Sequence, residues 1–338
     1  MKPDTHARPG TSFAFTLVEM LVVVAVIGIL IGILLPTIGA ARTRAQSAAC
    51  ASNLRQIGIA TRAYLNDNDE RLPQVWIENA QTNPTSSTIV PRGTEGASPI
   101  GTLFAGKRGL LPLYGIDRIG AQRRPLNSYL GVTDPPRDED EFAQSPTLDA
   151  DDRFQVEILR DPADRGGFIN YVTAFGLDAN VPSMYDLVGS SYVMNDHALQ
   201  PNPSNGTPVG DELPTLVPVL VDGYLPRDGR MPRVVSPGKT WLMGDQPIYN
   251  YDRFDYDESA RETRFGRNLR WHSRSDIRTN LLFVDLSVGT GLEVPSPFSV
   301  SDGDGFSNED IRSLNTTPDY TFLPRPDWRE RYENRHFD

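Results

Sequence analysis

The 338-residue chain contains one cysteine and only four histidines. A single cysteine excludes an intramolecular disulfide and any metal site built from several thiolates. We expect Cys50 to be a small buried residue rather than a reactive thiol. Basic residues are also scarce, because 33 Lys and Arg stand against 44 Asp and Glu, for a net charge of −11. A protein that follows nucleic-acid phosphates needs a basic surface, so we expect no nucleic-acid partner.

Long apolar runs are equally rare. Hydrophobic residues make up 38% of the chain and the mean hydropathy is −0.38, which excludes a membrane protein with many spans. The sequence has no nucleophile elbow, HExxH pair, phosphate-binding glycine loop or spaced cysteine set. We therefore expect no catalytic residues and no enzymatic activity.

One apolar block does occur, from Phe15 to Leu35, after a short and slightly basic leader at residues 1–14. Its length of about 21 residues, at about 1.5 Å each, matches the roughly 30 Å hydrocarbon core of a bilayer. A basic leader of this kind stays in the cytoplasm. The block fits a cleaved secretory signal peptide ending at Gly39-Ala40-Ala41, a plain signal anchor, or a third kind of signal.

The third alternative depends on the run from Ala14 to Glu19, Ala-Phe-Thr-Leu-Val-Glu. This run resembles the processing motif of type IV prepilins and type II secretion pseudopilins, in which a small residue, usually Gly, precedes Phe-Thr-Leu-Val-Glu. The resemblance implies that a prepilin peptidase cuts between Ala14 and Phe15 and methylates the new amine. It also implies an inner-membrane location and other pilin or pseudopilin subunits as partners. Pro36 falls where many pilins kink their first helix.

Glu19 is the only charge in the apolar block. A carboxylate in hydrocarbon costs on the order of a few kcal/mol unless it lies near the interface or meets a cation. In a stack of parallel helices Glu19 can pair with the Phe15 amine of the next subunit, which offsets this cost and sets the register of assembly. The alternative is a charge that reaches the headgroup level. Gly28 and Gly32 would allow neighbouring helices to approach closely.

Beyond Pro36, apolar residues recur every three or four positions and predict that the helix continues to about residue 68 as an amphipathic half. The run 66–69, rich in Asn and Asp and followed by Pro73, predicts its end. The apolar positions are Ala51, Leu54, Ile57, Thr61, Tyr64 and Leu65, and the opposite side carries Arg42, Arg55, Gln56 and Arg62.

The remainder, residues 69–338, is punctuated by Pro, Gly, Asn and Asp, which is typical of short strands joined by long loops. We expect the stretches 82–107 and 134–152 to be loops. The predicted strands are Phe168–Phe175, Ser191–Met194, Leu216–Leu220, Thr240–Met243, Leu281–Val284 and Ser287–Glu293.

These patterns predict an α+β, pilin-like fold with a long N-terminal helix packed on a β-rich, loop-rich globular domain. The expected parts are the leader 1–14, a membrane-spanning helix 15–36, its amphipathic half 37–68, and the domain 69–338 outside the cytoplasm.

A second resemblance lies in the C-terminal half. Ser191–Asn195, Trp271-His272 and Asn280–Asp285 are similar to segments of a large bacterial group of pilin-like proteins. That group ends in a His, a spacer and Asn-x-Leu-Phe-x-Asp-Gly-His. Leu286 and Ser287 stand here in place of the Gly and His, so no role of those two positions carries over.

Two further sets of residues are candidates for chemistry. His272 and Asp285 either form a metal or acid–base pair, as in an anchored hydrolase, or hydrogen-bond to order a loop. The segment 302–310 resembles calcium loops of extracellular repeats, although Val300 and Ile311 replace the first and last ligands of a full loop. The segment is either a calcium site, with Asp302, Asp304, Asn308 and Asp310 as ligands, or a solvated acidic loop.

The sequence therefore favours a structural pilin-like or pseudopilin-like subunit of a type IV pilus or type II secretion assembly. The alternative is a membrane-tethered binding module outside the cytoplasm with a calcium-stabilised loop.

Overall fold

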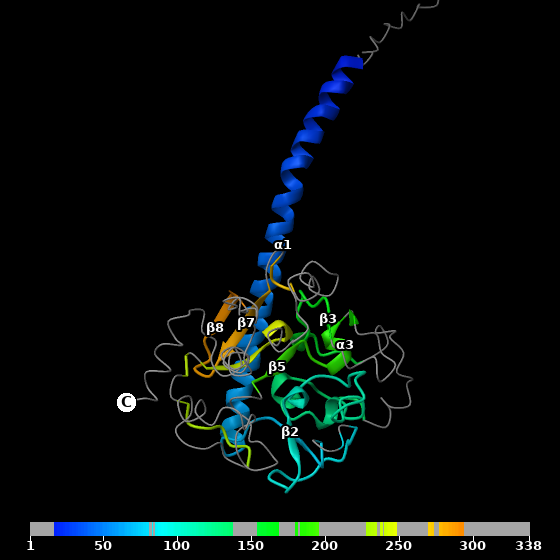
Figure 1. The fold of residues 1–338 in the computed structure, drawn as a ribbon. Coiled ribbons are helices and arrows are strands. Elements are labelled where there is room, and N and C mark those ends of the chain that lie inside the picture. Colours follow the sequence, from blue (N-terminus) through cyan, green and yellow to red (C-terminus); the bar gives the residue numbers. More distant parts are fainter. Residues whose placement is uncertain are drawn as a thin grey trace, which may run out of the picture. The chain divides into compact units, whose positions relative to one another are not determined.

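The computed structural model describes residues 17–80, 83, 85–137, 154–168, 180–181, 183–195, 228–234, 237–238, 240–248, 270–273 and 277–293. The chain forms two compact units, Met1–Arg44 and Ala45–Asp338. The boundary between them falls within the long helix α1 (Leu17–Asp67), drawn in blue in Figure 1.

In the first unit, residues 17–44 are helical throughout, and their large apolar side chains are unburied. Those from Leu17 to Ile38 are between 46% and 81% exposed. Among the described residues, α1 is the one helix long and apolar enough to cross a membrane, with a mean hydropathy of 3.0 in its most apolar stretch. This part of α1 therefore has the length and composition of a single membrane span.

Three predicted assembly positions interrupt the apolar surface of this unit. A Cβ added at Gly28 or Gly32 would meet no atom within 4 Å, so the space beside both glycines is open. Pro36 lies inside the helix and has no N–H, which deprives the carbonyl of Gly32 of its usual helical donor.

In the second unit, α1 changes character because only one side of it is covered. Its buried residues include every apolar position that the spacing predicts, and Arg55, Gln56 and Arg62 on the opposite side are exposed. The helix ends at Asp67, within the run 66–69 that predicts its end. Gly58 marks a close approach, because a Cβ there would lie 2.9 Å from Cδ1 of Leu282.

An antiparallel four-stranded sheet faces this side of α1, in the order β5-β6-β7-β8. Its strands are β5 (Tyr192–Met194), β6 (Trp241–Asp245), β7 (Arg278–Phe283) and β8 (Val288–Glu293), and each overlaps a predicted strand. The register shifts between Trp241 and Met243 in β6 and between Thr279 and Leu281 in β7.

Side chains alternate between the two faces of this sheet. Tyr192, Met194 and Leu282 pack in one core with Leu54 and Ile57 of α1. Val193, Trp241, Leu281 and Phe283 form a second cluster with Ile248. The central strands are therefore buried on both faces, which explains why β6 reads as a short, nearly continuous apolar run.

Two smaller antiparallel pairs complete the described strands, β1 (Val75–Ile77) with β2 (Ser98–Ile100) and β3 (Gly167–Phe168) with β4 (Asn180–Val181). The expectation that 82–107 is only loop is wrong at its end. There β2 leads into the 3-10 helix η1 (Gly101–Leu103), and residues 103–105 are fully buried. A β-pairing with β1 and a buried Phe104 outweigh the polar composition of the stretch before them.

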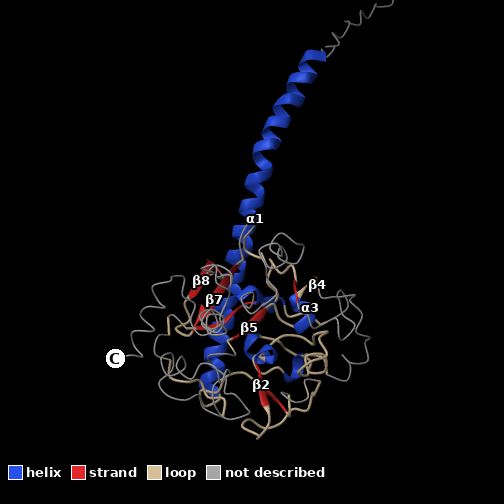
Figure 2. Ribbon diagram, viewed as in Figure 1, coloured by secondary structure: helices blue, strands red, loops and turns tan. Residues whose placement is uncertain are grey.

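Other short helices include the 3-10 helices η2 (Ala121–Arg123), η3 (Asn127–Leu130) and η5 (Glu157–Leu159) and the α-helix α3 (Met184–Val188). Figure 2 shows that loops and turns, in tan, connect most of these short elements. The described part of the chain thus combines one long apolar helix with a sheet-containing, loop-rich α+β domain. The predicted strand Leu216–Leu220 and residues 169–175 of another lie outside the described residues.

Candidate functional site

Four side chains from four separate segments converge within the second unit. Cys50 comes from α1, Asp161 follows η5, Asp245 ends β6, and His272 lies in the segment 270–273. Their potential ligand atoms all lie within 4.8 Å of one another, and all four residues are buried. We refer to these four residues as the buried cluster.

Asp245 is fixed by the strand beside it. Because β6 pairs with β7, the Thr279 hydroxyl donates to Oδ1 of Asp245, and the Asn280 N–H donates to Oδ2 at 2.8 Å. Nε2 of His272 lies 2.8 Å from the same Oδ2, and Sγ of Cys50 lies 3.9 Å from it. The position of this carboxylate is therefore set by the sheet.

Asp161 faces the same ring nitrogen from another side. Its Oδ2 lies 3.2 Å from Nε2 of His272, while its Oδ1 accepts the N–H of Ala163 at 2.7 Å. No described group makes a hydrogen bond of good geometry to Oδ2 of Asp161, whose ion-pair partner is His272. A ring nitrogen carries at most one hydrogen, so Nε2 of His272 can make a linear hydrogen bond to only one of the two carboxylates at a time.

Burial and charge act together on the titrating groups of the buried cluster. Burial by itself would lower the pKa of His272, but the Asp245 and Asp161 carboxylates outweigh it and raise the pKa to about 10. Burial raises the pKa of the Cys50 thiol, and the same two carboxylates raise it further. Burial also raises the pKa of Asp245, against the effect of His272. Without a cation, the cluster contains a protonated His272 and a neutral thiol.

Of the two alternatives for His272 and Asp285, the metal or acid–base pair is not formed, whereas Asp285 does hydrogen-bond to order a loop. The partners of His272 are Asp245 and Asp161, whereas Asp285 lies exposed in the turn between β7 and β8. There Oδ1 of Asp285 accepts the N–H and the hydroxyl of Ser287, at 2.9 and 2.6 Å. Closeness in sequence favoured Asp285, but the turn directs it to solvent.

The other predicted site residues are placed as follows. Glu19 lies in the first turn of α1, and Gly28, Gly32 and Pro36 follow it in the same exposed segment. The processing residues Ala14 and Phe15 lie outside the described residues, as do the four predicted calcium ligands at 302–310. Their predictions are untested.

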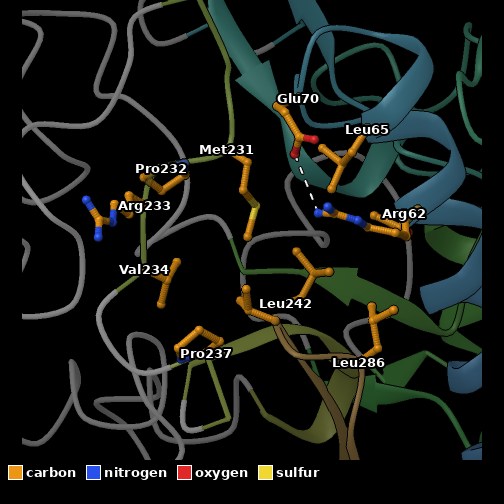
Figure 3. Close-up of a pocket in the computed structure, with 12 residues that line it drawn as sticks. Arg62, Leu65, Glu70, Met231, Pro232, Arg233, Val234, Pro237, Leu242 and Leu286 are labelled. Carbon is orange, nitrogen blue, oxygen red and sulfur yellow. Dashed lines mark ion pairs between the residues drawn. The ribbon is translucent and has the colours of Figure 1, made fainter.

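A separate cavity of about 300 Å³ opens near the C-terminal end of α1 (Figure 3). Its lining is mostly apolar and includes Leu65, Met231 and Leu242, and Arg62 and Glu70 form an ion pair of 3.5 Å at its side. Both partners of this pair are about half exposed, so the pair contributes little. The cavity contains none of the buried cluster, and it lacks convergent polar groups that would identify a ligand.

Sequence reasoning missed three of the four cluster residues. Burial of Cys50 was expected and is observed, but its neighbours were not. Asp245 carried a signal, since it is a charged residue at the end of an apolar strand, but the predicted strand stopped at Met243 and did not include it. Asp161 carried none, because it is one of many acidic residues in a loop-rich region.

Comparisons of the chain with protein families, with curated proteins and with solved structures found no match.

Proposed function

We propose that the chain is a structural pilin-like or pseudopilin-like subunit, processed by a prepilin peptidase and held in the inner membrane by its N-terminal helix. The observation that carries this proposal is that a processing motif and an exposed apolar helix occur next to each other in the sequence. The run Phe-Thr-Leu-Val-Glu at residues 15–19 leads directly into the first part of α1, where the large apolar side chains from Leu17 to Ile38 are all exposed. A plain signal anchor needs the apolar helix but not that motif.

The exposed glycines support packing among several such helices. Membrane helices associate through close packing, because lipid tails provide no hydrophobic drive between them. Gly28 and Gly32 leave open space on a helix whose other side chains are large. A second helix can therefore approach the backbone at these positions, as assembly into a filament requires.

Glu19 gives the proposed assembly its register. It lies four residues after Phe15, which would carry the new terminal amine after cleavage. In parallel helices offset along their axes, this carboxylate meets the amine of the adjoining subunit in a medium of low dielectric constant. The domain that begins beyond α1's apolar half then lies outside the cytoplasm, with the removed leader inside.

The N-terminus of protein isolated from membranes tests the proposal. We expect mass spectrometry and N-terminal sequencing to find a methylated Phe15. Ala14→Gly, which restores the residue usual in prepilins, should be cut at least as completely as the natural chain. An intact Met1 in both proteins would favour a plain signal anchor, and a start near Arg42 would indicate a secreted product.

A tethered binding module is the second candidate, favoured by the acidic 302–310 loop in the sequence. It predicts a membrane protein that never co-purifies with pilins or pseudopilins. Cross-linking in membranes followed by purification separates the two functions, because the pilin-like subunit yields covalent oligomers through α1.

A further inference from the structure

The donor atoms of the buried cluster have the spacing of a metal's ligands. Bonds of about 2.0–2.3 Å to a tetrahedral Zn²⁺ place neighbouring ligand atoms about 3.3–3.6 Å apart. The distances from Asp245 Oδ2 to His272 Nε2, from Asp161 Oδ2 to the same nitrogen, and from Asp245 Oδ2 to Cys50 Sγ are 2.8, 3.2 and 3.9 Å. These three distances bracket the tetrahedral spacing, and the remaining distances among the four ligand atoms are at most 4.8 Å, so side-chain shifts of about 1 Å bring all four atoms around one ion.

The hydrogen bonding of the cluster is incomplete without a cation. Oδ2 of Asp161 has no hydrogen bond of good geometry from the described groups, and its one ion-pair partner is His272, although the residue is only 2% exposed. A buried carboxylate oxygen without a donor is costly. It lies 3.2 Å from His272 Nε2, which is closer, at 2.8 Å, to Oδ2 of Asp245. A metal ion at the centre would occupy both carboxylate oxygens and the ring nitrogen together.

Asp164 lies three residues after Asp161. Its carboxylate shows how protein groups around this loop hydrogen-bond an aspartate with a purely structural role. Its Oδ1 accepts the N–H groups of Gly166 and Met184, and its Oδ2 accepts the N–H of Tyr185 and the hydroxyl of Ser191. Both oxygens of Asp164 are thus doubly satisfied by protein groups. The contrast indicates that the incomplete hydrogen bonding of Oδ2 of Asp161 is not a general property of this loop.

We propose that Cys50, Asp161, Asp245 and His272 bind one divalent cation of the zinc class as a closed structural site. Sulfur and nitrogen ligands favour Zn²⁺ or a similar transition metal over Ca²⁺ and Mg²⁺, which prefer oxygen. Four protein ligands leave no position for a substrate, which is typical of structural rather than catalytic zinc. On binding, the Cys50 thiol and the His272 ring each release the proton that occupies the ligand atom, and a thiolate and a neutral imidazole coordinate the ion.

Such an ion would connect α1 to the four-stranded sheet that packs against it in the second unit. Cys50 lies on the buried side of α1, and Asp245 lies at the end of a central strand of the sheet that packs against it. Asp161 and His272 add the loop after η5 and the segment 270–273. One metal therefore fixes four segments that are far apart in the sequence.

Cobalt titration of the full chain in detergent tests the site, after dialysis against a chelator. We expect one equivalent of Co²⁺ to bind and to give a thiolate-to-cobalt charge-transfer band in the near ultraviolet. Because Cys50 is the only cysteine, this band alone identifies it as a ligand. Added Zn²⁺ should abolish the band by displacement, whereas added Ca²⁺ should leave it unchanged.

Three variants sharpen the result. Cys50→Ser should lose the band, and Asp161→Asn should weaken Co²⁺ binding about 100-fold or more, since even changes around the ligands cost 10–100-fold. The matched control is Asp285→Asn, an exposed aspartate in a turn next to β7, which should bind as the natural chain does. Zn²⁺ should raise the melting temperature of the natural chain and of Asp285→Asn, but not that of Cys50→Ser.

Absence of stoichiometric Co²⁺ binding by the natural chain would overturn the proposal. So would a cobalt spectrum with no thiolate band, or a band that persists in Cys50→Ser. Absence of binding would leave the buried cluster as an ion pair of protonated His272 with two carboxylates, and the other two outcomes would show that Cys50 is not a ligand of the bound ion. The natural chain decides the question by itself even if a variant fails to fold.

Discussion

Helix α1 contains two regions with the same backbone and opposite relations to their surroundings. From Leu17 to Ile38 its large apolar side chains are about half or more exposed, whereas from Cys50 to Leu65 one side is buried in the domain's core. Helix formation is common to both, so it does not distinguish them. The first region is apolar on all sides and suits lipid or other helices; the second is apolar on one side and suits a single packed domain.

Because of this difference in burial, the two regions of α1 stabilise different things. In the proposed function the first region serves membrane insertion and assembly, and the second serves the folding of the domain. Side chains in the first region contribute nothing to the described domain's core, so changes there should affect only insertion and assembly. Side chains in the second region determine whether the domain folds. Substitutions at matched positions can therefore test the two regions separately.

The largest expected effect lies in the first region. Glu19→Ala should leave membrane insertion intact, because it removes a charge from the apolar helix, and should abolish incorporation into filaments, because the Phe15 amine loses its partner. Membrane fractionation measures insertion, and co-purification with other subunits measures assembly. Glu78→Gln, a change at an exposed acid in the domain, is the control. Normal filament incorporation of Glu19→Ala would contradict the pairing.

In the second unit, His272→Ala should have the largest effect on stability. Removing one partner of a buried ion pair costs about 3–5 kcal/mol, because Asp161 and Asp245 would remain buried with no cation. Urea denaturation of chelator-treated protein measures this loss. Asp285→Asn should change the free energy of unfolding by less than about 0.5 kcal/mol, since Asp285 is exposed and Asn keeps an acceptor oxygen for Ser287. Equal losses in both variants would show that His272 does not hold the carboxylates.

Isoleucines of α1 give a direct comparison of the two regions. Ile57→Ala should cost about 2–5 kcal/mol, because this side chain is fully buried. Ile31→Ala, in the first region, should leave the domain's unfolding unchanged. Ile59 lies two residues from Ile57 but is 67% exposed, so Ile59→Ala should cost no more than about 0.5 kcal/mol. A cost at Ile59 comparable to that at Ile57 would mean that the helix face has been assigned wrongly.

Substitutions of glycine should give the smallest effect on stability. They compare the two regions of α1 in the same way as the isoleucines do. Gly58→Leu should destabilise the domain by about 1–3 kcal/mol, because the new side chain overlaps Leu282. Gly28→Leu should not change the domain's stability, since space beside Gly28 is open. It should instead weaken association between helices, measured by cross-linking in membranes. Unchanged cross-linking in Gly28→Leu would remove the glycines from the assembly interface.

Sequence reasoning predicted best where one local period repeats over many residues. The period of three to four residues from Ala51 to Leu65 predicted the buried side of α1, and short apolar runs predicted the positions of β5 to β8. It failed at β2, where Ser98-Pro99-Ile100 has weak strand character and is held by its pairing with β1. A short strand set by its partner leaves little trace in its own residues.

The candidate site could not be predicted for a related reason. Burial of Cys50 followed from the helix period, and His272 was singled out by the scarcity of histidine. The positions of Asp161 and Asp245 beside His272 depend on the register of β6 and on the conformation of the loop after η5. No local sequence pattern predicts either of these. Sequence proximity favoured Asp285, which the turn before β8 directs into solvent.

The order of strands has a consequence for how the domain can be made. In the sheet, β7 lies between β6 and β8, and it follows directly on the segment that carries His272. During synthesis, Cys50, Asp161 and Asp245 emerge before His272 and β7. The buried cluster and the sheet therefore cannot form until the later part of the chain has been made. A nascent chain interrupted before residue 271 would expose an unpaired edge of β6 and two aspartates without a cation, and should be a preferred substrate for chaperones and proteases.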